Sequence, residues 1–191
     1  IGWNARVGAG EPYDRDPELQ QITGELSTFH SAYGIDDSVP PAPLFIYNAW
    51  TDDLFPADEA VRYWRRTSVE HPDAEIALHF ADGFGHPRAA LGGNIAIVQG
   101  RIDDFFARHL LGRDAEPAPG VEVYTQACGD AEVEGPFTAP SWDELHGGEV
   151  RLVDGRTRHF DSTGGDPAVA AALDPLSGPP CRTVDARDEP N

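Results

Sequence analysis

The chain has 191 residues, of which 33 are acidic and 14 are basic, so its formal net charge is −19. Every basic residue is an arginine, and the sequence contains no lysine. Such a surface repels phosphate backbones and anionic lipid, so we expect neither nucleic acid nor a membrane as a partner. No apolar run approaches the roughly 20 residues that a membrane-spanning helix needs.

The first predicted element is a helix that begins near Asp16. Its apolar side chains recur every three or four residues, which places them on one face of a helix. They are Leu19, Ile22, Leu26, Phe29 and Tyr33. Gly34 is expected to end this helix, because glycine is the usual residue just past a helix end.

Two strands and two helices then alternate. The short apolar run 44–47 predicts a buried strand, and a helix is expected from Pro56 to about Val69. A second strand is predicted over 75–81, followed by a helix that Asn94 caps and Gly112 ends. This order is typical of a parallel sheet with crossover helices, so the predicted fold class is α/β.

Charges at the two ends of the first crossover helix support its boundaries. Asp58 and Glu59 suit its first turn, and Arg65 and Arg66 suit its last turn. Acidic groups are favoured at the positive end of the helix dipole and basic groups at the negative end.

The composition changes after Gly112. Residues 114–120 contain two prolines and predict a linker, and 121–126 predicts a strand. Further short strands are expected at 149–153 and 156–160, in a stretch that glycine and proline interrupt every few residues. We therefore expect an irregular β-rich segment here.

The two cysteines are Cys128 and Cys181. A disulfide between them would stabilise the fold by about 4 kcal/mol in the chain-entropy model, provided that the compartment is oxidising. Two buried thiols are the alternative. Pairing would favour a secreted protein, and otherwise the sequence leaves a secreted and a cytoplasmic location open.

Candidate chemistry follows the two predicted parallel strands. Asp52 and Asp53 come after the first strand, and His86 comes after the second, between residues that favour a loop. In an open α/β sheet, functional groups lie on the loops that leave the carboxyl ends of the strands. A carboxylate and an imidazole in these places can meet, and the carboxylate then fixes the tautomer of the ring.

Each of these residues also has an ordinary structural explanation. Asp53 or Asp58 could cap the following helix, and a metal site of Asp52, Asp53 and His86 is disfavoured because adjacent carboxylates rarely face one ion. We expect the remaining histidines to be structural. They are His30, His71, His79, His109, His146 and His159.

Two segments resemble the C-terminal half of an α/β hydrolase. One reads Pro43-Leu-Phe-Ile-Tyr-Asn-Ala-Trp-Thr-Asp-Asp-Leu-Phe-Pro56, and the other reads Phe84-Gly-His-Pro-Arg88. The branch that they resemble most contains X-prolyl dipeptidyl peptidases and cocaine-esterase-like acylases. Residues 120–126 and 135–142 are similar to the passage by which such enzymes enter a C-terminal jelly-roll domain.

The resemblance implies a role for two residues: Asp52 would be the acid of a catalytic triad, and His86 would be its base. Trp50 lies just before the acid, and it would either line the substrate pocket or pack in the core. The chain departs from the family because no serine lies in a Gly-x-Ser-x-Gly motif, and neither cysteine occupies such a position. We expect the nucleophile and its oxyanion-hole amides to precede Ile1, so that these 191 residues alone lack triad-dependent activity.

Applied to the whole chain, the resemblance predicts three parts. Residues 1–42 form a helical and loop region, either a cap or part of the main sheet. Residues 43–113 form the C-terminal half of the hydrolase core, and 114–191 form a linker and the beginning of a jelly-roll-like domain.

The predicted function is a serine hydrolase that cleaves a small ester, an amide or a peptide through an acyl-enzyme, with no cofactor and no metal. The rival is a non-catalytic binding module on a hydrolase scaffold, whose β-rich part contacts carbohydrate or a partner protein. Phe137 and Trp142 would then contribute to that surface, although burial at the domain junction is the favoured interpretation of both. The sequence leaves the substrate and the oligomeric state open.

Overall fold

The computed structural model describes residues 16–52, 54–86, 94–114, 120–125, 133–148 and 168. The chain divides into two compact units: the described residues from 37 to 148 belong to one, and those from 16 to 36 belong to the other. Within the described part of the chain, no helix has the length and apolar character needed to cross a membrane.

Among its described residues, the unit that contains the N-terminal part of the chain has one long helix. Helix α2 spans Pro17–Phe29, and a short 3₁₀ helix, η2, follows at Ala32–Gly34. The Asp16 carboxylate accepts the first free backbone N–H groups of α2 and so fixes its start. The predicted continuation of the helix to Tyr33 is wrong: α2 ends at Phe29, whose exposed side chain provides no packing that would extend the helix.

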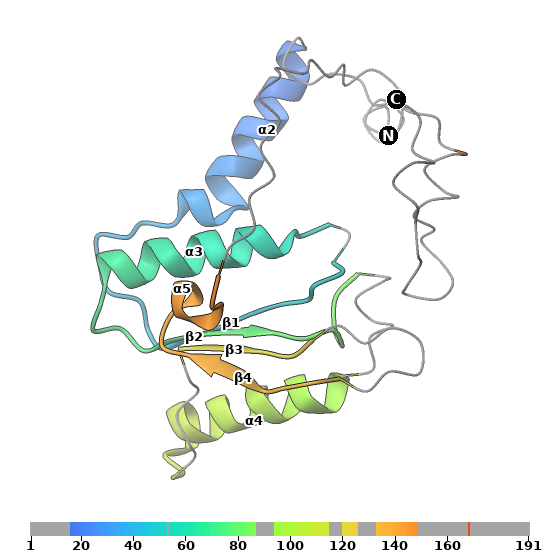
Figure 1. The fold of residues 1–191 in the computed structure, drawn as a ribbon. Coiled ribbons are helices and arrows are strands. Elements are labelled where there is room, and N and C mark those ends of the chain that lie inside the picture. The colour runs from blue at the N-terminus through green and yellow to red at the C-terminus, as the bar shows by residue number, and fades with distance from the viewer. Residues whose placement is uncertain are drawn as a thin grey trace. The chain divides into compact units, whose positions relative to one another are not determined.

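The second unit is built on a four-stranded sheet (Figure 1). Its strands are β1 (Leu44–Asn48), β2 (Ile76–Phe80), β3 (Val121–Val123) and β4 (Phe137–Ala139), in that spatial order. The pairs β1–β2 and β2–β3 are parallel, and β3–β4 is antiparallel. The prediction of an α/β fold with parallel strands is therefore confirmed.

Helices cover both faces of this sheet (Figure 1). Helix α3 (Ala57–Glu70) connects β1 to β2 and lies on one face, and helix α4 (Ile95–Leu111) lies on the other. A short helix, α5 (Trp142–Leu145), follows β4 and packs on the same side as α3. The predicted strands at 149–153 and 156–160 lie outside the described residues, as does most of the predicted linker.

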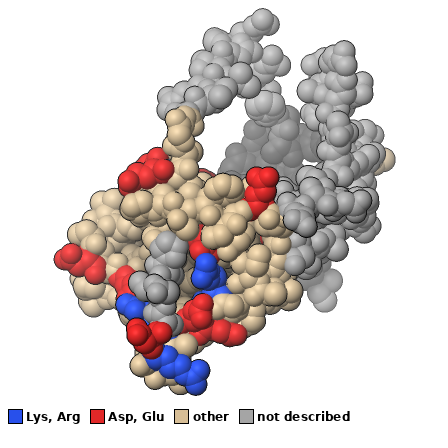
Figure 2. Space-filling model, turned by 60° about the horizontal axis from the view of Figure 1, so that its bottom comes forward, with Lys and Arg blue, Asp and Glu red and all other residues tan. Residues whose placement is uncertain are grey.

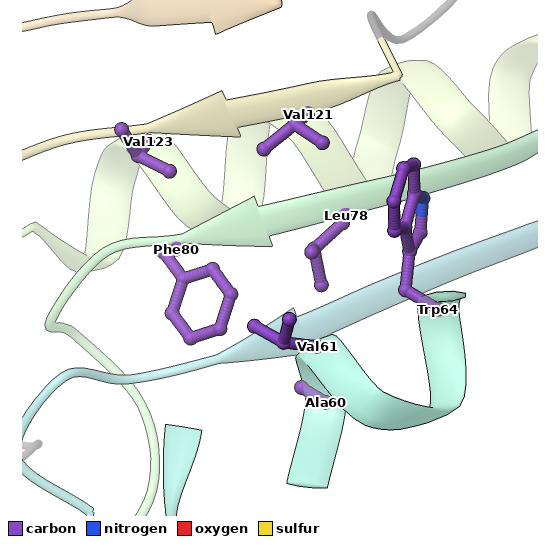
Figure 3. Close-up of a cluster of buried hydrophobic side chains, with 7 residues drawn as sticks. All are labelled: Ala60, Val61, Trp64, Leu78, Phe80, Val121 and Val123. Carbon is purple, nitrogen blue, oxygen red and sulfur yellow. The ribbon is translucent and has the colours of Figure 1, made fainter. Parts of the chain in front are cut away.

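The main apolar core lies between α3 and the sheet (Figure 3). Leu78 and Phe80 of β2 are completely buried there, because alternate residues of a strand face the same side. Seven residues make up the buried cluster: Ala60, Val61, Trp64, Leu78, Phe80, Val121 and Val123. A smaller cluster on the α4 side contains Ala81, Val98 and Tyr124.

Arginines on α3 do not lie where the sequence predicts. The helix begins with Asp58 and Glu59 in its first turn, as expected, but its last turn holds no basic residue because it continues to Glu70. Arg65 instead pairs with Asp143, just inside α5, and Arg66 pairs with Asp37 at 2.7 Å. These side chains connect α3 to distant segments rather than stabilising its end.

On the face shown in Figure 2, the acidic side chains of the described residues lie at several separate places rather than in one patch. Several of the few arginines lie beside them. Arg108 of α4, for example, donates to Glu75 at 3.2 Å. Exposed pairs of this kind contribute little to stability.

Helix α4 begins directly against the loop that leaves β2. The N–H of Asn94 donates to the carbonyl of Asp82, and a Cβ atom on Gly83 would lie only 2.7 Å from the backbone nitrogen of Ile95. Asn94 is the N-cap residue, as predicted, but its side chain makes no capping hydrogen bond. At the other end, Gly112 adopts a left-handed conformation with φ of 60° and ends α4 as predicted.

The close approach at Gly83 gives a first prediction. Gly83→Ala should lower the free energy of unfolding by about 1–3 kcal/mol, because the new methyl group meets backbone atoms that cannot rotate away. The matched control is Gly100→Ala in the middle of α4, where nothing lies within 4 Å of the new methyl group. This control should raise stability by about 0.5–1 kcal/mol. Urea unfolding measures both, and an equally stable Gly83→Ala variant would contradict the packing described.

Candidate functional site

The first candidate residue, Asp52, lies in the turn that follows β1. We call residues 49–52, 54 and 55 the Asp52 turn. The Oδ1 atom of Asp52 accepts hydrogen bonds from the N–H groups of Leu54 and Phe55, both at 2.9 Å. An aspartate that binds the amides two and three residues ahead closes the turn on itself. The backbone thus holds this carboxylate in one orientation.

The second candidate residue, His86, lies in the segment that follows β2, six residues after the end of that strand. We call residues 81–86 the His86 loop. Gly85 in this loop has a φ of 124°, a conformation that L side chains rarely adopt, which explains a glycine directly before the histidine. Residue Asn48 at the end of β1 pairs with Phe80 at the end of β2, so both segments leave the sheet at the same edge.

The structure brings Asp52 and His86 together. The Nδ1 atom of His86 lies 2.9 Å from Oδ1 and 3.1 Å from Oδ2 of Asp52, across 34 residues of sequence. The Asp52 side chain is only 8% exposed, whereas that of His86 is 34% exposed. With Nδ1 occupied by the carboxylate, Nε2 is the ring nitrogen that is left to exchange a proton with another group.

The electrostatics of Asp52 favour its ionised form. Burial of the carboxyl acts to raise its pKa, but the amides of Phe55 and Leu54 and the contact with His86 outweigh burial, and the net pKa is lowered. Asp52 is therefore a carboxylate at neutral pH.

Two side chains outside the pair join the segments that carry it. Asp82, at 2% exposure, accepts hydrogen bonds from the backbone N–H and the hydroxyl of Thr51, at 3.2 and 3.1 Å. Burial of the Asp82 carboxyl raises its pKa although these bonds act against that shift. The Tyr47 hydroxyl contacts the backbone of Ala81 and Phe84 at 2.9 to 3.1 Å.

Apolar side chains lie beside the His86 ring. The ring centroids of Phe55 and His86 are 5.1 Å apart, and Phe55 is 60% exposed. Its neighbour Leu54 is 65% exposed. Phe55 does not stand out in the sequence as a site residue, because it lies three residues after Asp52, where the start of a helix is the simpler interpretation.

Trp50, the predicted pocket residue, lies against the core. Its ring stacks on Phe80 with centroids 4.7 Å apart and lies 6.3 Å from that of Trp142. Its Nε1 donates to the carbonyl of Tyr124 at 2.7 Å. These contacts correspond to the packing alternative that the sequence left open for Trp50.

Other predicted residues lie outside the described part of the chain. Asp53, Cys128 and Cys181 are among them, so the alternative metal set that includes Asp53 and the disulfide both stay predictions. Among the residues that are described, no group of three His, Cys, Asp or Glu side chains could hold a metal ion.

One hollow among the described residues lies away from the pair. It has a volume of about 430 Å³ and lies next to the amino ends of β1 and β2, opposite the edge that carries Asp52 and His86. Its lining consists of Pro40, Pro41, Pro43 and residues 70–75. A substrate at the pair would not occupy this hollow.

A second histidine and carboxylate pair lies inside the sheet, on its α4 side. His79 and Glu122 are register partners on β2 and β3, with Nδ1 and Oε1 3.1 Å apart. Arg101 of α4 holds the same carboxylate through two hydrogen bonds of 2.7 Å. The rings of Phe45 and Tyr124 pack against His79, and His79 and Glu122 are both almost fully buried.

This network is structural in character, because it fastens α4 to the sheet. Burial acts to raise the pKa of Glu122, but His79 and Arg101 outweigh burial and lower it. The sequence signal for the network was a histidine and a glutamate inside otherwise apolar strand runs. A polar side chain in such a run indicates that it needs a hydrogen-bond partner when buried, but the sequence does not show which residue that partner is.

The Glu122 network gives a second prediction. Glu122→Gln should lower the free energy of unfolding at pH 7 by about 2 kcal/mol, less than for a fully buried pair because Arg101 is 35% exposed. Because the folded protein lowers the pKa of Glu122, this stabilisation is complete above the ordinary value of 4.5 and is lost as pH falls through the lowered pKa. Urea unfolding at pH 7 and at acidic pH measures the loss.

The matched control is Glu75→Gln, which removes a carboxylate that is 42% exposed and that also faces α4 through Arg108 and His109. It should change stability by less than about 0.5 kcal/mol. Equal losses in the two variants would contradict the importance of the buried network.

Comparisons with family models, with curated proteins and with solved structures found no match to this chain. The α/β sheet and the contact between Asp52 and His86 are therefore the features from which a function has to be inferred.

Proposed function

We propose that Asp52 and His86 are the acid and base of a serine hydrolase, which cleaves an ester or amide bond through an acyl-enzyme. The observation that carries the proposal is the 2.9 Å contact between Nδ1 of His86 and Oδ1 of Asp52 at the carboxyl edge of two adjacent parallel strands. The nucleophile and the oxyanion-hole amides are proposed to come from residues of the protein outside these 191.

In the proposed mechanism, Nε2 of His86 takes the proton of the serine hydroxyl while the serine oxygen bonds to the substrate carbonyl carbon. The tetrahedral intermediate then expels the alcohol or amine, which leaves with the proton held on Nε2. A water molecule repeats the sequence on the acyl-enzyme and releases the acid. Asp52 keeps Nδ1 protonated throughout and stabilises the transient imidazolium.

The surface next to His86 favours a substrate with an apolar group. Leu54 and Phe55 expose their side chains although both are large and apolar, and Phe55 contacts the ring that would carry the proton. A leaving group or acyl group that reaches Nε2 therefore passes beside apolar surface. The acidic surface elsewhere disfavours substrates with a high negative charge.

The third prediction concerns the pair itself. In the full-length protein, His86→Ala and Asp52→Asn should each lower kcat for hydrolysis of a model ester such as p-nitrophenyl butyrate by at least about 10³-fold. The exposed residues His146 and Asp58 provide matched controls, since His146→Ala and Asp58→Asn should leave kcat unchanged within about twofold. Unchanged rates in the His86 and Asp52 variants would contradict the proposal and favour the binding module.

The fourth prediction concerns the substrate. Phe55→Ala should raise KM for an ester with an aromatic leaving group by about tenfold, because roughly half the apolar contact area of a phenyl ring is worth 1–2 kcal/mol. KM for methyl acetate should change much less. Phe106→Ala on α4, which removes a phenyl ring of similar exposure, serves as the control. An equal effect on both esters would show that Phe55 does not contact the substrate.

A further inference from the structure

The contact between Asp52 and His86 depends on two loops that have no strand pairing of their own. Asp52 lies four residues beyond the end of β1, and His86 lies six residues beyond the end of β2. Loop segments move easily unless contacts fix them. A hydrogen bond of 2.9 Å between Asp52 and His86 is therefore favoured by further contacts that hold both segments in one arrangement.

The first such contact is a carboxylate in the His86 loop. Oδ1 of Asp82 accepts both the backbone N–H and the hydroxyl of Thr51, the residue directly before Asp52. Asp82 is 2% exposed, so these are buried bonds that water does not easily replace. The backbone carbonyl of Asp82 also accepts the N–H of Asn94, which ties the same residue to the start of α4.

The second contact starts from the strand that precedes the acid. The Tyr47 hydroxyl accepts the N–H of Phe84 at 3.1 Å and donates its single proton to the carbonyl of Ala81 at 2.9 Å or of Phe84 at 3.0 Å. A side chain of β1 thus holds the backbone of the His86 loop two residues before the histidine. Its ring also packs edge-on against Phe84, with centroids 6.3 Å apart.

These two contacts cross between the loops in opposite directions. Asp82 reaches from the His86 loop to the Asp52 turn, and Tyr47 reaches from the strand of the acid to the His86 loop. Both are separate from the apolar cluster between α3 and the sheet, which does not include either residue. The contacts of Asp82 and Tyr47 are therefore placed where they can set the distance and angle between Asp52 and His86.

We propose that Tyr47 and Asp82 are positioning residues, which hold the Asp52 turn and the His86 loop so that Asp52 accepts the Nδ1 proton of His86. The inference rests on the proposed function only for its consequence in catalysis. The alignment of the two loops is a property of the chain itself and can be measured without any substrate.

The test uses the tautomer of His86, because the ring nitrogen that carries the proton is set by the hydrogen bond at Nδ1. In long-range proton and nitrogen NMR spectra of the full-length protein, at a pH where the imidazole is neutral, His86 is identified by comparison with His86→Ala. The wild-type ring should carry its proton on Nδ1. In Tyr47→Phe and Asp82→Ala, about half or more of the molecules should instead carry it on Nε2, which is the preferred tautomer of a free imidazole.

Two variants serve as controls, and a third replaces Asp82→Ala if that variant does not fold. Asp82→Asn keeps an oxygen that can accept from Thr51 and should restore the wild-type tautomer. Tyr63→Phe removes a hydroxyl from α3 and should leave the tautomer unchanged. If Asp82→Ala does not fold, Thr51→Val removes one of the same two hydrogen bonds at a less buried place and should shift the tautomer in the same direction.

Hydrolysis gives the second readout. Tyr47→Phe should lower kcat by about tenfold to a hundredfold with KM unchanged, as expected for a misplaced base. If His86→Ala leaves hydrolysis intact, the proposed function fails. The tautomer of His86 measured by NMR still tests whether Tyr47 and Asp82 position the two loops. A wild-type ring protonated on Nε2, or an unchanged tautomer in both Tyr47→Phe and Asp82→Ala, would overturn the inference.

Discussion

The parallel pairing of β1 with β2 is the constraint on which the candidate site depends. Its register places Asn48 opposite Phe80, so the chain leaves both strands at the same edge of the sheet. A shift of the register would separate Asp52 from His86 and would also turn Leu78 and Phe80 away from the core under α3. The burial of these two side chains therefore supports the geometry of a polar pair that lies several residues away.

The two faces of the sheet contribute in different ways. The α3 face is an apolar core, and the α4 face combines a small apolar cluster with the His79, Glu122 and Arg101 network. That network resembles the Asp52 and His86 pair in composition, since each joins an imidazole to a carboxylate. The two differ in access and partners: His79 is 1% exposed and shares its carboxylate with an arginine, whereas the His86 side chain is 34% exposed. Of the two, only the pair of Asp52 and His86 leaves its histidine accessible to a substrate.

The sequence predicted the parts of the structure that depend on local pattern. The α/β class, β1, β2, α3 and α4 follow from apolar periodicity and from glycine and proline positions, and the meeting of Asp52 with His86 follows from their places after parallel strands. Elements of three or four residues, such as β4 and α5, are too short to show a period. The partners of Arg65, Tyr47 and Asp82 depend on contacts between distant segments, which residue types alone do not specify.

We propose that His86, oriented by Asp52, activates a serine elsewhere in the protein. The most direct test of this proposal is reaction of the full-length protein with a fluorophosphonate, followed by mass spectrometry of the labelled peptides. We expect one serine outside these 191 residues to be labelled stoichiometrically, at a rate that falls by at least about a hundredfold in His86→Ala. Absence of a labelled serine, or an equal rate in the variant, would contradict the account.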